Sequence, residues 1–187
     1  MTKPNYNHPK FVINVEDKRL EEHNKRMWLT LTINKNLTDT VLVILKNPSR
    51  ATKEISDKTV YNVTSYIYKN KDRFEELKNI GKVTILNLIP FYETYSNQLA
   101  NTYSNVIDEE NLFVINEFTL EHKLVIIAWG NHPKGLLSEF ERLKTSVFKI
   151  LRTNKTQIYY VDKLSNKGNP KHGQVWGYEN NLLLYNS

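Results

Sequence analysis

Amide, imidazole and lysine side chains follow successive apolar stretches of this sequence. Asn47 comes just after the apolar run 41–45, and Asn87 comes at the end of a second such run. A third run ends in Trp-Gly-Asn-His at 129–132, and a fourth polar segment, 167–173, carries lysines, glycines and a histidine. Together with nearby aromatic rings, these groups are suited to hydrogen-bonding and stacking on a flat nucleobase beside phosphate-binding cations.

The run 41–45 predicts the strand that positions the first of these groups. It is unbroken and rich in β-branched residues, which is typical of a strand buried on both faces. Pro48 cannot donate a hydrogen bond to a neighbouring strand, so the strand has to end before it. Since parallel strands end at the same edge of a sheet, we expect the polar segments to converge on one cleft at the carboxyl edge.

Strand and helix patterns alternate along the rest of the chain. Buried strands are expected at 82–89, 123–129 and 157–161, with helices at 58–70, 105–118 and 134–151 and a short helical piece at 73–79 that ends at Gly81. This alternation predicts an α/β fold, a three-layer sandwich with a central, mainly parallel sheet of about four core strands.

The N-terminal region is expected to add antiparallel strands to that sheet. Strands are predicted at 11–15 and 26–33, with 16–26 as a connector or short helix. Residues 1–10 are predicted to be a flexible arm. We find no repeat and no linker, so we expect a single domain over residues 1–187.

The charge of the chain favours an anionic partner. Lys and Arg number 26 against 20 Asp and Glu, for a net charge of +6. DNA or a nucleotide is therefore expected as a partner, although a basic protein with no such partner fits the charge equally well. No apolar stretch reaches the roughly 20 residues of a membrane helix, and the first residues resemble no signal peptide. We expect a cytoplasmic protein with no membrane partner.

Several other chemistries are not supported by the spacing of residues. The segment 130–135 lacks the Lys-Ser/Thr ending of a P-loop, and no strand precedes a dinucleotide-type glycine pattern. Ser49 and Ser56 lack the flanking glycines of a nucleophile elbow. The absence of cysteine excludes thiolate metal ligands, cysteine nucleophiles and disulfides. We therefore expect no metal and no cofactor.

Each candidate residue also has an ordinary structural explanation. Asn47 and Asn87 are as readily explained as turn residues. A tryptophan at a strand end, such as Trp129, is typically a core residue. His132 can be explained as a cap of the following helix. The lysines and histidine of 163–172 are compatible with a solvated surface. Their recurrence at corresponding strand ends is what favours a site.

The motifs resemble those of a bacterial family called domain of unknown function 1643. They are Leu-Lys-Asn-Pro-Ser-Arg-Ala at 45–51 and Asp-Lys-Thr at 57–59, followed by Asn87-Leu88, Trp129-Gly130 and Lys171-His172. They occur in the order of the family pattern and span residues from about 27 to 176, nearly the whole chain.

The same landmarks are more remotely similar to those of the uracil-DNA glycosylase superfamily. This resemblance implies a uracil-DNA glycosylase-like fold in which Asn47 orients the attacking water and Asn87 reads a base edge. It also implies that His172 stabilises charge on the departing base and that Phe91 or Tyr92 stacks on it. Because Asn47 is an amide, it cannot act as a general base, so hydrolysis would rest on water positioning and stabilisation of the base.

The sequence thus predicts a nucleic-acid- or nucleobase-binding protein, with hydrolysis of an N-glycosidic bond as the reaction to test. The alternatives are a non-catalytic module that binds DNA or a protein, and an enzyme that acts on free nucleotides. The candidate catalytic residues are Asn47 and His172. The candidate base- or nucleic-acid-binding residues are Lys46, Pro48, Ser49, Arg50, Asn87, Phe91, Tyr92, Trp129, Asn131, His132 and Lys171.

Overall fold

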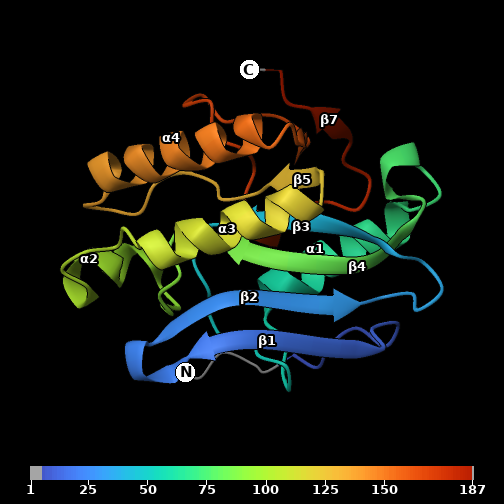
Figure 1. Ribbon diagram of the computed structural model, residues 1–187, viewed down its shortest axis with the longest axis horizontal. Helices are drawn as coiled ribbons and strands as arrows, with labels where there is room; N and C mark the ends of the chain where they lie inside the picture. The colour runs from blue at the N-terminus through green and yellow to red at the C-terminus, as the bar shows by residue number, and fades with distance from the viewer. Residues whose placement is uncertain (1–5, 187) are drawn as a thin grey trace.

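The computed structural model describes residues 6–186, which form an α/β fold around one seven-stranded sheet (Figure 1). The strand order is β1-β2-β4-β3-β5-β6-β7. The strands are β1 (Asn14–Leu20), β2 (Lys25–Thr32), β3 (Asp39–Leu45), β4 (Ile80–Asn87), β5 (Leu124–Ile127), β6 (Gln157–Val161) and β7 (Leu182–Leu184). The α-helices are α1 (Lys58–Asn70), α2 (Leu99–Thr102), α3 (Glu109–Glu121) and α4 (Leu137–Thr153). Short 3-10 turns are η1 (Glu21–His23), η2 (Glu75–Leu77), η3 (Ser96–Gln98) and η4 (Gly173–Val175).

Strand β3 lies at the centre of the sheet, as its apolar sequence predicts. It is parallel to β4 on one side and to β5 on the other, and β5 is parallel to β6. Every residue from Thr40 to Leu45 is buried. The predicted set of four parallel core strands is therefore confirmed, and their carboxyl ends share one edge.

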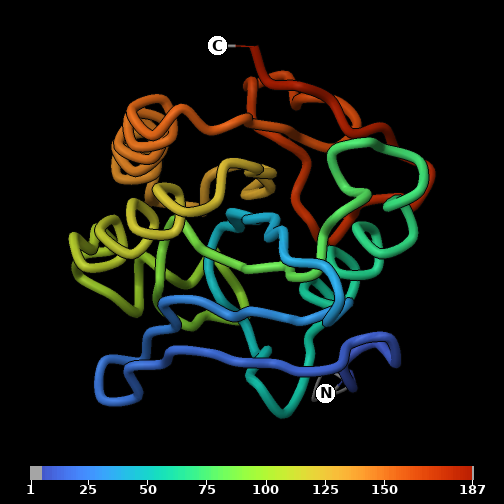
Figure 2. The backbone as a smooth tube through the Cα atoms, turned by 45° about the vertical axis from the view of Figure 1, so that its right-hand side comes forward, coloured from blue at the N-terminus to red at the C-terminus, as the bar shows by residue number. Residues whose placement is uncertain are grey.

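Helices cover both faces of the sheet (Figures 1 and 2). On one face, Val43 of β3 packs in a cluster with Val63 and Ile67 of α1. On the other face, Ile44 packs in a cluster with Ile115 of α3 and Phe140 of α4. Successive residues of β3 face opposite layers because side chains alternate along a strand, so the unbroken apolar run serves two cores at once.

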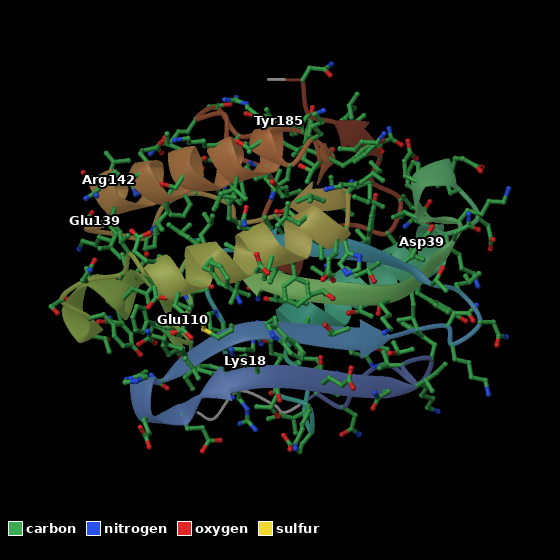
Figure 3. All side chains as sticks on the ribbon, in the orientation of Figure 1. Lys18, Asp39, Glu110, Glu139, Arg142 and Tyr185 are labelled. Carbon is green, nitrogen blue, oxygen red and sulfur yellow. The ribbon has the colours of Figure 1, made fainter. Side chains whose placement is uncertain are left out.

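Charged side chains lie on the outside of these layers. Lys18, Asp39, Glu110 and Arg142 are exposed, and Figure 3 labels these four side chains. None of the helices within residues 6–186 has the length and apolar character that a membrane crossing requires.

The N-terminal region adds antiparallel strands to the sheet, as predicted, but the bounds of the first strand differ. Residues 14–20 form strand β1, which pairs antiparallel with β2, where the sequence predicted a short strand at 11–15 and a connector or short helix from 16. The charged residues occupy an edge strand whose side chains alternate between exposed and half-buried positions. Pairing with β2 therefore outweighs the high polarity of the segment.

The start of one helix and the C-terminal end of the sheet also differ from the prediction. Helix α3 begins at Glu109, where Asp108 accepts the Asn111 N–H at 2.8 Å, and not at residue 105. The apolar tail contains a third antiparallel strand, β7, which pairs with β6 and was not predicted. The sheet is therefore mixed, with antiparallel strands at both edges.

The predicted arm at 1–10 is described only from residue 6. The Tyr6 carbonyl accepts the Ser56 N–H at 2.7 Å, and His8 Nε2 donates to the Thr52 carbonyl at 3.0 Å. Residues 6–8 thus lie along the loop that follows β3.

Gly81 is a strand residue and not the end of a helix. It lies in β4, and a Cβ at this position would stand 1.9 Å from the Leu37 carbonyl oxygen. The close approach of the Leu37 backbone therefore requires glycine.

Replacing Gly81 with alanine is expected to lower the free energy of unfolding by about 3 kcal/mol, because backbone rather than a flexible side chain has to move. Urea unfolding followed by circular dichroism measures the change. Lys82→Ala, at the exposed neighbouring position of the same strand, is the control. Equal stability of the two variants would contradict the close approach.

Candidate functional site

A pocket of about 360 Å³ opens at the carboxyl edge of β3 and β4. We call it the edge pocket. Five parts of the chain form its walls: Tyr6 near the N-terminus, the loop after β3, the start of α1, the segment 93–96 after β4, and the turn around η4. Its lining residues are Tyr6, Lys46, Asn47, Ser49, Arg50, Ser56, Asp57, Lys58, Thr59, Glu93, Thr94, Ser96, His172 and Gln174.

The Asp57 carboxylate holds the loop of the edge pocket against α1. Its Oδ1 caps the helix by accepting the Val60 N–H at 2.8 Å. Its Oδ2 accepts the N–H groups of Arg50 and Ala51, both at 3.3 Å. One side chain therefore fixes the backbone that carries Ser49 and Arg50 relative to the helix.

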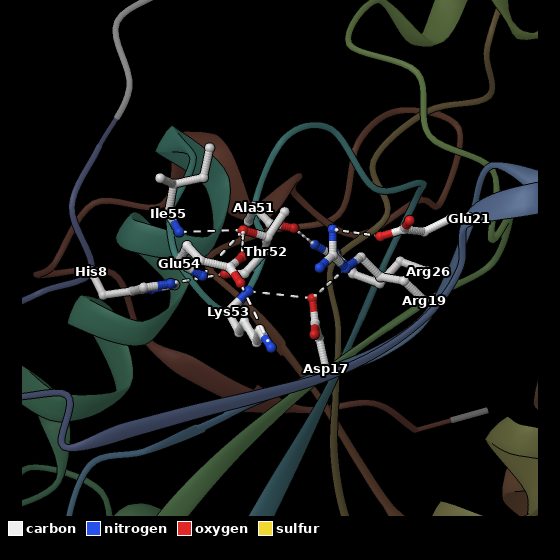
Figure 4. Close-up of polar contacts among 10 residues, drawn as sticks. All are labelled: His8, Asp17, Arg19, Glu21, Arg26, Ala51, Thr52, Lys53, Glu54 and Ile55. Carbon is white, nitrogen blue, oxygen red and sulfur yellow. Dashed lines mark hydrogen bonds and ion pairs between the residues drawn. The ribbon is translucent and has the colours of Figure 1, made fainter.

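The antiparallel strands hold the same loop from its other side (Figure 4). Arg26 of β2 is 1% exposed, and its Nη1 donates to the Ala51 carbonyl at 2.9 Å. Asp17 of β1 accepts the Lys53 N–H at 3.3 Å and forms an ion pair with Arg19 at 3.0 Å. Strands β1 and β2 are therefore the outer support of the edge pocket.

Asn47 has a fixed amide orientation. Its Nδ2 donates to the carbonyls of Pro48 at 2.9 Å and Glu93 at 2.7 Å, which uses both N–H groups. A flipped amide would place Oδ1 against two carbonyl oxygens, so the observed orientation is the stable one. Asn47 Oδ1 makes no hydrogen bond to another residue within 6–186. It can therefore accept a hydrogen bond from a ligand in the edge pocket.

His172 supplies a donor to the same pocket. Its Nδ1 accepts the Gln174 N–H at 3.2 Å. Burial, with a smaller contribution from the positive charge of Lys46, lowers the pKa of His172 to about 4. The ring is therefore neutral at pH 7, and because Nδ1 is an acceptor, the proton is on Nε2.

Gly130 fixes the place of His172. Its φ is +68°, and a Cβ on it would stand 3.0 Å from the Cβ of His172. The Gly173 N–H also donates to the Ala128 carbonyl at 3.2 Å. The end of β5 thus packs directly against the turn that carries the histidine, which explains why a Trp-Gly pair and a late histidine occur together.

The edge pocket offers more positive than negative charge to a ligand. Lys46 is half-buried, and its Nζ has no hydrogen bond or ion pair with another residue of the described chain; burial lowers its pKa. Arg50 and Lys58 also line the pocket. Of the two acids, Asp57 is engaged as described, and Glu93 accepts the Tyr95 N–H at 2.9 Å.

Five of the predicted site residues lie together in the edge pocket: Lys46, Asn47, Ser49, Arg50 and His172. Pro48 is in the same loop, where its carbonyl accepts hydrogen bonds from Asn47 Nδ2 and the Glu93 N–H, and it does not line the pocket.

Asn87 and Trp129 are fully buried and do not line the edge pocket. The Asn87 backbone carbonyl accepts Asn111 Nδ2 at 2.9 Å, while its own side-chain amide has no partner within residues 6–186. Trp129 packs edge-on against Phe148 with ring centroids 5.5 Å apart. Both residues contribute to the layers beneath the edge.

The two predicted stacking residues also lie outside the edge pocket. Phe91 stacks on Tyr103, with centroids 4.4 Å apart. The Tyr92 hydroxyl is buried near Arg26, and burial raises its pKa. Neither ring faces the ligand space.

The remaining predicted residues form a neighbouring cluster. Asn131 Oδ1 accepts from Ser165 Oγ and from Asn169 Nδ2, both at 3.1 Å. His132 Nε2 lies 3.5 Å from Lys167 Nζ. Lys171 forms an ion pair with Asp162 at 2.8 Å. These contacts join the loop after β5 to the loop after β6.

Sequence reasoning missed most of the opposite wall, including Lys58, Thr59, Glu93 and Gln174. Asp57 was identified as part of the Asp-Lys-Thr motif at 57–59, and its bonds to Arg50 and Ala51 depend on the folded course of the loop. The Asp-Lys-Thr motif at 57–59 was the available signal, because all three of its residues line the pocket. No group of three or more potential metal ligands occurs among residues 6–186.

The lowered pKa of His172 makes stability depend on pH. Between about pH 6.5 and pH 4 the unfolded chain binds a proton at this position that the native chain does not, so stability falls as the pH falls. From pH 7 to pH 5 the loss is expected to be up to about 2 kcal/mol, and His172→Gln should reduce it. Urea unfolding at the two pH values measures it, and His23→Gln, at an exposed position in η1, is the control for the loss of an imidazole. If His172→Gln left the pH dependence unchanged, the assignment of a buried neutral ring would be wrong.

The comparison with known proteins identifies the family but no activity. No curated protein and no solved structure matches the chain. The family model described as "Protein of unknown function (DUF1643)" matches residues 25–173, a range that holds the loop after β3, the start of α1 and His172. The chain therefore belongs to the DUF1643 family.

Proposed function

We propose that this protein binds a nucleic acid or a nucleotide in the edge pocket. The observation that carries the proposal is Lys46, a half-buried cation with no acidic partner among the described residues, beside an oriented acceptor and an oriented donor. Removing a cation from water without a counter-charge is unfavourable, and an anionic ligand would offset that cost. Arg50 and Lys58 add to the attraction of a phosphate.

The neutral part of the ligand is proposed to be a nucleobase. Asn47 Oδ1 accepts and His172 Nε2–H donates, and the edge of a base offers both donors and acceptors. A pocket of about 360 Å³ is within the range of small-molecule sites. Its place at the carboxyl ends of β3 and β4 is where open α/β sheets bind ligands.

The uracil-DNA glycosylase-like fold is part of the same proposal. The parallel core strands, the loop Asn47-Pro48 at the end of β3 and the late histidine agree with it. The buried position of Asn87 does not, because a base reader has to reach the ligand. In our proposal the base is therefore read by Asn47 and His172.

Lys46→Gln is expected to weaken binding of nucleoside 5′-monophosphates or short oligonucleotides about tenfold, the effect of losing one partly desolvated charge contact. Titration calorimetry at low and moderate salt measures it, and wild-type affinity should fall as salt rises. Lys149→Gln, an exposed lysine on α4, is the control for charge alone. Equal affinities of the Lys46 variant and wild type would refute the proposal that the ligand binds in the edge pocket.

A second function, hydrolysis of an N-glycosidic bond, is favoured by the Asn47 orientation. Oδ1 can accept a hydrogen bond from water and direct it at the sugar C1′. As the C1′–O bond forms, the C1′–N bond breaks and its electron pair goes to the base, where His172 Nε2–H would donate a hydrogen bond. The proton that water releases has to leave to solvent, because an amide cannot take it.

In this mechanism Asn47→Ala and His172→Ala would each reduce turnover by about 100-fold or more while the protein stays folded. Oligonucleotides carrying uracil, mismatched or modified bases, scored for abasic sites, are the assay. Asn36→Ala, at an exposed position in the turn before β3, is the matched amide control. Unchanged cleavage by both site variants would exclude this mechanism.

A further inference from the structure

Lys46 brings a partly desolvated primary amine to the edge pocket. Two lysines, Lys46 and Lys58, line the pocket, and Lys58 is exposed. Lys46 is half-buried, and its Nζ has no hydrogen bond or ion pair with another residue within 6–186. Burial without a counter-charge disfavours the ammonium form and lowers the pKa of Lys46. A larger fraction of this amine is therefore neutral, which is the form that acts as a nucleophile.

The backbone that carries Lys46 is fixed against the segment after β4. The Lys46 carbonyl accepts the Ile89 N–H at 2.9 Å. Two residues further on, the Pro48 carbonyl accepts the Glu93 N–H at 3.0 Å. The side chain of Lys46 therefore starts from a rigid position at the wall of the pocket, which reduces the conformational freedom that a reaction at Nζ would have to remove.

Groups that bind oxygen atoms lie in the same pocket as this amine. His172 is neutral at pH 7 and has its proton on Nε2. Burial and then the positive charge of Lys46 lower the pKa of His172, so the ring and the amine lie within electrostatic reach of each other. Ser49 and Thr59 add hydroxyl-bearing side chains to the lining. The pocket therefore places a nucleophilic amine among partners for the oxygens of a sugar.

We propose that Lys46 forms a covalent imine with the aldehyde of an abasic nucleotide in DNA. This inference rests on the proposed function of the edge pocket, whose cations bind the flanking phosphate. A nucleotide that has lost its base carries a C1′ hemiacetal, which opens to an aldehyde, and aldehydes condense with primary amines. An abasic nucleotide is also the product of N-glycosidic hydrolysis, so the imine would follow that reaction at the same site.

The condensation proceeds in two steps. The neutral Nζ adds to C1′, the π electrons of the C=O bond move to oxygen, and the proton that nitrogen loses passes to that oxygen through solvent. The C1′–O bond then breaks as the oxygen takes a second proton from solvent and leaves as water, while the nitrogen lone pair forms the C=N bond. His172 Nε2–H donates a hydrogen bond to the oxygen while negative charge develops on it. The protonated imine keeps one positive charge, so its attraction to the phosphate is preserved.

The test traps the imine with sodium cyanoborohydride, which adds hydride to C1′ and leaves a stable secondary amine. The probe is a fluorescent single-stranded oligonucleotide with one abasic site, and the adduct is resolved by denaturing electrophoresis and located by peptide mass mapping. We expect the adduct at Lys46. Its rate of formation should rise from about pH 6 to about pH 8, because the neutral fraction of the amine rises.

Lys46→Arg separates the charge from the nucleophile, because arginine stays charged and has no primary amine. We expect its adduct yield to fall at least about twentyfold. Its affinity for a strand with a tetrahydrofuran abasic analogue, which has no aldehyde, should stay within about threefold of wild type. Lys149→Gln removes an exposed lysine on α4 and should give the wild-type yield. Melting temperatures verify that both variants are folded.

The failure of this inference is distinguishable from failure of the proposed function. If wild type binds the analogue strand but yields no adduct with the abasic strand, the imine is overturned and the binding function stands. An adduct at a different lysine, or an undiminished yield from Lys46→Arg, would also overturn the imine alone. A wild-type protein that binds neither strand would overturn both proposals.

Discussion

The Asp57 carboxylate is the interaction on which the edge pocket depends. It caps α1 with one oxygen and holds the N–H groups of Arg50 and Ala51 with the other. The loop leaves β3 at a proline and has no sheet partners of its own, so its course is set by what its backbone groups bond to. Lys46, at the start of this loop, has no ion pair with a residue of the described chain, so an anionic ligand can pair with it.

Arg26 completes this arrangement from the opposite side. A guanidinium that is 1% exposed is costly unless its N–H groups are bonded, and Nη1 bonds the Ala51 carbonyl. Ala51 is thus held at its N–H by Asp57 and at its carbonyl by Arg26. The antiparallel strands β1 and β2 consequently have a role in the site as well as in the sheet. Of the two strands, the family match includes β2, since it starts at residue 25, the first residue of that strand.

The parts of the fold that were predictable are those where hydrophobic pattern decides the outcome. The run 41–45 is apolar on both faces and could only be a central strand, and helix α1 was predictable from its cap and apolar stripe. Most of strand β1 was missed because exposed charged residues such as Glu16 and Lys18 alternate with half-buried ones at a sheet edge, where pairing and not burial stabilises the strand. Strand β7 is three residues long, which is too short for any periodicity.

The parts of the site that lie directly at strand ends were predictable, and the parts on long loops were not. Asn47 and His172 lie in one pocket because strand ends and their loops gather at one edge, which a sequence pattern can indicate. Asn87 follows the same rule in sequence and is nevertheless buried, because side chains alternate along β4 and the last position of the strand is covered by the layers around it. The wall at 93–96 depends on the course of a long loop, which no local pattern specifies.

The most direct test of a ligand-binding edge pocket is a two-dimensional ¹H–¹⁵N spectrum recorded during titration with a nucleoside 5′-monophosphate and then with a single-stranded oligonucleotide. The account predicts that the amide signals of residues 46–59, 93–96 and 172–174 shift first, with little change in α4. Shifts confined to other surfaces, or no shifts with either ligand, would contradict it.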